Sequence, residues 1–97
     1  MKLITKAIAR QIPRLHAQAG KGESSLAFLK LFTPWSHWTW YVLELDPETK
    51  DCFGLVQGLD TELGYFNLGE LEKIEGPLGL AIERDIHFEP TPLSQLR

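Results

Sequence analysis

Only one cysteine occurs among the 97 residues of the chain, and apolar runs such as that at 40–43 extend over only a few positions. An internal disulfide needs two cysteines, so Cys52 favours a reducing compartment, and we expect a cytoplasmic location. A membrane-spanning helix needs about 20 consecutive apolar residues, far more than any run here. Basic residues interrupt the apolar positions near the N-terminus, so we expect no signal peptide there.

The chain is also short and carries little net charge. Ninety-seven residues are too few for two independent cores, so we expect a single domain over residues 1–97. With 43% hydrophobic and 24% charged residues, the composition is typical of a globular protein. The formal net charge of −3 argues against a module that binds duplex DNA, because such domains usually have a pI above about 9.

Charge is unevenly distributed along the sequence. Residues 1–30 contain six basic side chains and one carboxylate, whereas residues 40–97 contain four basic side chains and twelve carboxylates. Two interpretations remain open at this point. Either the two parts neutralise each other within the fold, or they present two faces to different partners.

The first segment has the pattern of a short amphipathic helix. Ile4, Ile8 and Ile12 recur every four residues and therefore share one face. Thr5 is a suitable N-cap. Pro13 disfavours helical geometry in the residue before it, so we expect the helix to end there.

A second helix is predicted after Asn67. This residue is a suitable N-cap, and Glu70 stands three positions later, as in a capping box. Gly76-Pro77 provides the stop signal. The expected buried stripe consists of Leu68, Leu71 and Ile74.

The remaining segments have strand patterns. In the segment 38–46, strict alternation of the side chains would place Val42 and Glu44 on one face. In the segment 52–58, Gly54 and Gly58 have no side chains, and a neighbouring indole could lie across one of them. Together with the helices, these segments predict an α+β fold, a single domain with an antiparallel sheet of about four to five strands and two or three short helices. Strands are expected over residues 27–33, 38–46, 52–58, 63–66 and 82–88.

Three tryptophans lie within six residues, at Trp35, Trp38 and Trp40. Trp38 and Trp40 share one face if the segment is a strand. Such rings stack against bases of single-stranded nucleic acid or anchor protein partners, but they also supply apolar area that a small core needs. We favour the core for Trp40. For Trp35 and Trp38 both interpretations stay open, and they are candidate binding residues.

Basic side chains line the face of the first predicted helix opposite to its isoleucines. They are candidate contacts for nucleic acid or for an acidic protein surface. They could instead neutralise Glu44 and Asp46, and a solvated helix face is the commonest interpretation of such a stripe. The residues are Lys2, Lys6, Arg10 and Arg14.

Other polar groups give weaker indications of chemistry. Glu83, Asp85 and His87 project from one face if their segment is extended, and this donor set could hold a divalent metal. Alternate residues of a strand lie about 6–7 Å apart, however, and do not converge on one ion unless the strand kinks. Charges on an edge strand are the simpler interpretation. Cys52 has no evident histidine partner. We therefore expect no cofactor and no catalytic residues.

Short motifs are spaced along nearly the whole sequence in a recognisable order. They are Leu3-Ile4-Thr5, Lys30-Leu31-Phe32-Thr33-Pro34, Thr39-Trp40, Glu44-Leu45-Asp46-Pro47, Phe53-Gly54-Leu55, Glu62-Leu63-Gly64-Tyr65-Phe66 and Ile82-Glu83-Arg84-Asp85. In these motifs the protein resembles DUF family 2958, small bacterial proteins of unknown function. The resemblance implies carriage by plasmids, conjugative elements and phages, near replication, transfer or anti-defence genes. It implies no reaction and no binding residue.

The sequence therefore favours a non-enzymatic accessory protein of mobile genetic elements that binds another, unidentified protein. Its acidic part could imitate the charge pattern of nucleic acid, which suits an anti-defence or DNA-processing role. One alternative is a protein that binds single-stranded nucleic acid through the segment Trp35–Trp40 and the basic helix. Another is a metal-dependent hydrolase that uses Glu83, Asp85 and His87.

Overall fold

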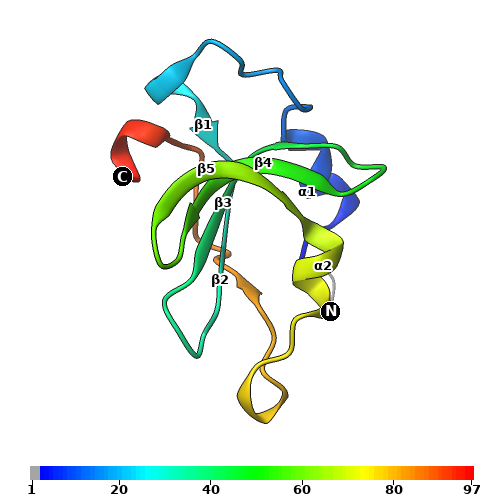
Figure 1. Cartoon of the computed structure of the whole chain (residues 1–97). Coiled ribbons are helices and arrows are strands. Elements are labelled where there is room, and N and C mark those ends of the chain that lie inside the picture. The colour runs from blue at the N-terminus through cyan, green and yellow to red at the C-terminus, as the bar shows by residue number, and fades with distance from the viewer. Residues whose placement is uncertain (1–2) are drawn as a thin grey trace.

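A computed structural model describes residues 3–97, which are built around a five-stranded antiparallel sheet in the order β5-β4-β3-β2-β6 (Figure 1). A separate two-stranded sheet pairs β1 with β7. The predicted α+β fold with an antiparallel sheet and short helices is confirmed. The strands are β1 Leu26–Ala27, β2 Leu29–Phe32, β3 Thr39–Leu45, β4 Asp51–Gln57, β5 Thr61–Asn67, β6 Glu83–Arg84 and β7 Thr91–Pro92, and the 3-10 turns are η1 Gly22–Ser24, η2 Pro77–Gly79 and η3 Leu93–Gln95.

The first helix forms where the sequence predicted it. α1 spans Lys6–Gln11, and the Thr5 hydroxyl accepts a hydrogen bond from the Ile8 N–H at 3.2 Å, as an N-cap does. Ile12 follows with an extended backbone, as expected for a residue before proline. In the described residues no helix is long and apolar enough to cross a membrane.

The second helix begins as predicted but buries a shorter stripe. α2 spans Leu68–Lys73, and the Asn67 side chain accepts a hydrogen bond from the Glu70 N–H at 3.2 Å. Leu68 and Leu71 are buried, whereas Ile74 is 41% exposed. The prediction for Ile74 is wrong because the helix ends one residue earlier, at Lys73, and Ile74 has an extended backbone.

Two predicted strands are shorter or divided in the structure. The segment 27–33 divides at Phe28, so that β1 pairs with β7 while β2 stays in the main sheet. The segment 82–88 forms only the two-residue β6, which pairs with β2. The prediction that residues 85–88 are extended is wrong, because the backbone turns at Asp85, whose carbonyl oxygen accepts a hydrogen bond from the N–H of Phe88 at 3.2 Å.

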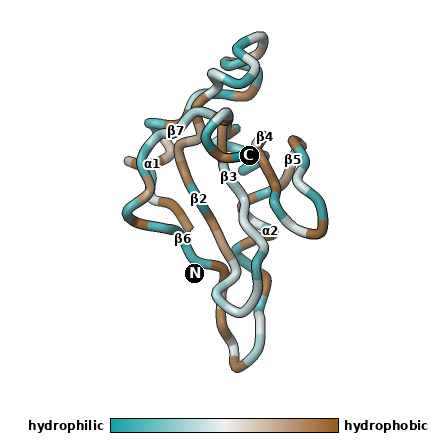
Figure 2. Tube along the Cα trace, turned by 90° about the vertical axis from the view of Figure 1, so that its left-hand side faces the viewer, coloured by the Kyte–Doolittle hydropathy of each residue, from teal (hydrophilic) through white to brown (hydrophobic). Residues whose placement is uncertain are grey.

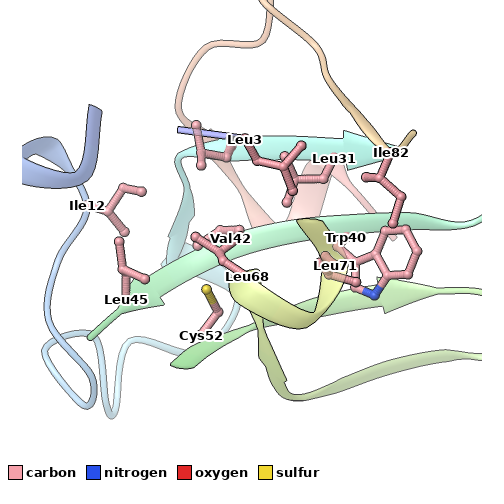
Figure 3. Close-up of a cluster of buried hydrophobic side chains, with 11 residues drawn as sticks. Leu3, Ile12, Leu31, Trp40, Val42, Leu45, Cys52, Leu68, Leu71 and Ile82 are labelled. Atoms are coloured by element: carbon pink, nitrogen blue, oxygen red, sulfur yellow. The ribbon is translucent and has the colours of Figure 1, made fainter. Parts of the chain in front are cut away.

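Apolar side chains gather on both faces of the sheet. Figure 2 shows β2 as a mainly apolar strand with one hydrophilic position, which is Lys30. One core lies between the sheet, the two helices and Ile82 (Figure 3). A smaller core lies on the opposite face, under the C-terminal segment. The first comprises Leu3, Ile12, Leu29, Leu31, Trp40, Val42, Leu45, Cys52, Leu68, Leu71 and Ile82, and the second Ala27, Tyr41, Leu43, Leu55 and Leu93.

A β-bulge in β3 decides which side chains face each core. Val42 and Glu44 pair with consecutive residues of β4, which leaves Leu43 as the extra residue. Leu45 therefore lies in the same core as Val42, while Glu44 lines the same pocket as Leu43. The strict alternation, which placed Val42 and Glu44 on one face, is wrong because the bulge interrupts it.

The bulge directs the Glu44 carboxylate at the loop that follows α1. Glu44 is only 5% exposed and accepts hydrogen bonds from the backbone N–H groups of His16 and Gln18, each at 2.8 Å. The Gln18 amide in turn donates to the carbonyl oxygens of Leu26 and Leu43, both at 2.9 Å. Backbone groups, and not the basic side chains of α1, therefore satisfy this carboxylate.

We expect Glu44→Ala to lower the free energy of unfolding by about 2–3 kcal/mol, because two buried N–H groups lose a charged acceptor. Urea denaturation measures this change. Hydrogen exchange at the amides of His16 and Gln18 should accelerate in the same variant. Glu48→Ala, in the exposed turn before β4, is the control and should change stability by less than about 0.5 kcal/mol. Equal effects of the two substitutions would contradict this role of Glu44.

Candidate protein-binding surface

Each of the three tryptophan rings packs against another part of the protein. Trp40 is buried in the larger core. Trp38 is half-buried and stacks on Trp40, with ring centroids 5.9 Å apart and planes inclined by 27°. Its indole lies across Gly58, where an added Cβ would come within 2.3 Å of the ring. The prediction that an indole lies across Gly54 or Gly58 is confirmed at Gly58, the residue that follows β4.

Trp35 lies in the β2–β3 turn, and its indole packs against a second segment of the protein. A Cβ added to Gly76 would lie 2.6 Å from two ring carbons of Trp35, so only glycine fits beneath the ring. Gly76 belongs to the loop between α2 and β6. Trp35 therefore fixes this loop against the end of the β2–β3 hairpin.

The loop between α2 and β6 is a narrow projection at the bottom of Figure 1. Its two arms are joined by an isolated bridge between Glu75 and Ala81 and by a hydrogen bond from the Gly76 N–H to the Leu80 carbonyl at 2.7 Å. Leu78 lies at its end, with a left-handed backbone (φ 57°, ψ 24°) and a side chain that is fully exposed. A bulky residue with positive φ is an outlier.

Two further exposed apolar side chains, Ile74 and Leu80, lie on the two arms of this projection. We call this set the hydrophobic tip, and it lies beside a shallow pocket of about 480 Å³ that Leu80, Arg84 and Ile86 line. The tip lies in an acidic part of the sequence: between positions 70 and 85 there are five carboxylates and two basic side chains. One of these carboxylates, Glu72, is paired with Lys50. The hydrophobic tip consists of Ile74, Leu78 and Leu80, with exposed fractions of 41%, 101% and 41%.

The predicted basic residues are not part of the tip. Lys6 and Arg10 are exposed on α1, and the segment after α1 is bonded to the last residue of β3 by a hydrogen bond from the Leu45 N–H to the Pro13 carbonyl oxygen (Figure 1). The tryptophan segment leads into the first residue of this strand. Arg14 is also exposed, and Lys2 lies outside the described residues. The N–H groups of the 46–51 turn lower the pKa of Asp46, and the nearby Arg14 acts in the same direction. The structure thus does not bring the basic helix and the tryptophan segment together.

The chain turns directly after β6, and Cys52 lies in the larger core. Asp85 accepts a hydrogen bond from the His87 N–H at 2.9 Å and so forms a turn. Among residues 3–97, Glu83 and His87 do not join it in a group of three metal-ligating side chains.

Burial raises the pKa of the Cys52 thiol to about 12, and the neighbouring Asp51 acts in the same direction. Cys52 is thus a neutral part of the core.

Sequence reasoning missed the hydrophobic tip. Glycine and proline are the usual stop signals, so the segment Gly76-Pro77-Leu78-Gly79-Leu80 predicts only the end of a helix. One further signal is present in this segment. Two leucines alternate with glycines in a stretch that has neither helical nor strand periodicity, so neither leucine has an assigned place in the core.

We expect Gly76→Ala to displace the Trp35 ring, because the new methyl group would overlap the indole. Tryptophan emission should shift to longer wavelength, and the free energy of unfolding should fall by about 1–3 kcal/mol. Gly64→Ala is the control, since a Cβ at Gly64 has no atom within 4 Å and should leave the emission unchanged. An unchanged spectrum for Gly76→Ala would show that Trp35 does not fix the loop.

The comparisons with known proteins identify a family without assigning a reaction to it. No curated protein and no solved structure matches the sequence. A family model described as "Protein of unknown function (DUF2958)" matches residues 3–96, nearly the whole sequence. The motifs that carried the resemblance, from Leu3-Ile4-Thr5 to Ile82-Glu83-Arg84-Asp85, lie within this range. The chain therefore belongs to the DUF2958 family.

Proposed function

We propose that the protein is a non-enzymatic protein-binding module whose hydrophobic tip inserts into an apolar pocket of a partner protein. The observation that carries this proposal is Leu78, a fully exposed leucine on a left-handed backbone at the end of a braced projection. Glycine would relieve the backbone strain at this position, and a polar residue would avoid the exposed apolar surface. Neither feature of Leu78 stabilises the isolated fold, so we assign both to contact with a partner.

The charges around the tip indicate what the partner presents. The loop that carries the tip lies in an acidic part of the sequence, with five carboxylates against two basic side chains between positions 70 and 85. Complementary charge favours encounter and suppresses wrong partners, so the partner's pocket should have a basic rim. Basic surfaces of this kind occur on proteins that bind nucleic acid. This supports a role against defence systems or in DNA processing.

The cellular setting of this proposal comes from the family resemblance. We place the protein in the cytoplasm, as an accessory of plasmids, conjugative elements or phages. Trp35 supports the tip from below by packing on Gly76. Direct contact of Trp35 and Trp38 with the partner stays a prediction, and so does contact of Lys6, Arg10 and Arg14. These contacts are tested by replacing each of these residues with alanine and measuring capture of the partner, as described below for Leu78.

Binding of single-stranded nucleic acid is a second candidate with one observation in its favour. Trp38, Lys30 and Arg84 line a pocket of about 530 Å³, so an aromatic ring and two cations lie near one another. Bases stack on such rings while cations contact phosphates. Quenching of tryptophan emission by a single-stranded oligonucleotide, weakened by salt, would support it. No response up to about 100 micromolar oligonucleotide would count against it.

We expect Leu78→Ser to abolish capture of the partner from the native host carrying the mobile element. A purified partner should bind this variant at least about tenfold more weakly, because truncation of a central anchor costs about 2 kcal/mol or more. Leu59→Ser is the matched control, since Leu59 is 88% exposed in the β4–β5 turn. A partner that binds Leu78→Ser as tightly as the unchanged protein would refute the proposal.

We expect Leu78→Gly to weaken partner binding without weakening the fold. Glycine adopts φ near 57° without strain, while it also gains freedom in the unfolded state, and these effects oppose each other. The free energy of unfolding should stay unchanged or rise by up to about 1 kcal/mol. Thermal and urea denaturation measure this change. A loss of more than about 1 kcal/mol would show that Leu78 stabilises the fold itself.

A further inference from the structure

The two edges of the five-stranded sheet differ in length and protection. At one edge β6 has only two residues, Glu83–Arg84. At the other edge β5 has seven residues, Thr61–Asn67, all paired with β4 without a shift in register. Among residues 3–97, β5 pairs with β4 alone. Every second residue of β5 therefore turns its N–H and C=O toward an open edge.

The open edge lacks the devices that usually prevent strands from pairing. β5 contains no proline, no lysine and no bulge, and Glu62 is its only charged residue. Leu63 and Tyr65 are 39% and 63% exposed on the same face. The Tyr65 ring packs beside Phe53 of β4, with centroids 5.1 Å apart, so the apolar strip continues into the sheet.

We propose that β5 pairs antiparallel with β5 of a second copy of the protein and joins the two sheets into one of ten strands. A two-fold axis at Gly64 is the one position at which all seven residues of both strands overlap. In this register Leu63 of each copy lies opposite Tyr65 of the other. The inference is independent of the hydrophobic tip, which lies on the loop after α2.

The residues at and around the axis fit this register. Gly64 has no side chain and nothing within 4 Å of its Cβ position, so the two strands can approach closely at the centre. The two Glu62 side chains are offset by four residues along the strands, about 14 Å, which limits their repulsion. Thr61 and Asn67, which can hydrogen-bond, lie opposite each other at both ends.

Two solution measurements test this pairing on the full-length protein. Sedimentation velocity at about 100 micromolar should give the mass of two copies, falling to one on dilution. Hydrogen exchange should then show every second amide of β5 protected at high concentration and exchanging rapidly at low concentration. A monomer at every concentration, with those amides unprotected, would overturn the proposal, and so would a dimer whose β5 amides stay unprotected.

Substitutions on the strip identify the interface. Tyr65→Lys and Leu63→Lys each place a charge on an exposed edge position and should leave only monomers at the same concentration. Leu78→Ser should still form dimers, because the tip takes no part in the contact. Circular dichroism and cooperative unfolding of each variant show that the fold persists. A dimer mass for both lysine variants would overturn the proposal, whatever Leu78→Ser does to partner binding.

Discussion

The β-bulge at Leu43 is the feature on which the arrangement of both cores depends. β3 is the central strand of the sheet, and a shift of one residue there exchanges the faces of all later side chains. Without the bulge, Leu45 would leave the larger core and the Glu44 carboxylate would enter it unpaired, at a high desolvation cost. With it, the carboxylate receives two backbone N–H groups from the loop after α1. One extra residue thus accommodates a buried charge and orders a loop with no regular strand or α-helix.

Glycines under indoles connect the fold to the proposed binding surface. Trp38 on Gly58 and Trp35 on Gly76 bring a ring against backbone where any larger residue would collide. The first contact joins the residue before β3 to the residue after β4. The second fixes the projection that carries Leu78, although no regular secondary structure supports that projection. A small fold thereby presents an apolar anchor on a rigid base, which lowers the entropy lost on binding.

The sequence predicted what depends on local chemistry. The caps at Thr5 and Asn67, the positions of the three strands β3, β4 and β5, and the indole over glycine follow from spacing and residue type, and the structure contains them. The bulge could not be predicted, because Glu44 fits either face until its hydrogen-bond donors are known. The open β5 edge depends on strand order, which alternation does not encode. The role of Leu78 could not be predicted, because the glycines and proline around it indicate a turn whether or not the residue at the end of that turn has a function.

The two proposed contacts involve different kinds of unsatisfied group, and this difference suggests how they combine. β5 offers backbone donors and acceptors, which any strand can satisfy, so self-pairing removes a general liability for aggregation. The hydrophobic tip offers one side chain held in a strained conformation, which suits a pocket of matching shape. If two copies pair through β5, each assembly carries two tips. A partner with two pockets, or two neighbouring partners, would then bind with an effective concentration set by the rigid ten-stranded sheet. Modest affinity at each tip would suffice for selective capture.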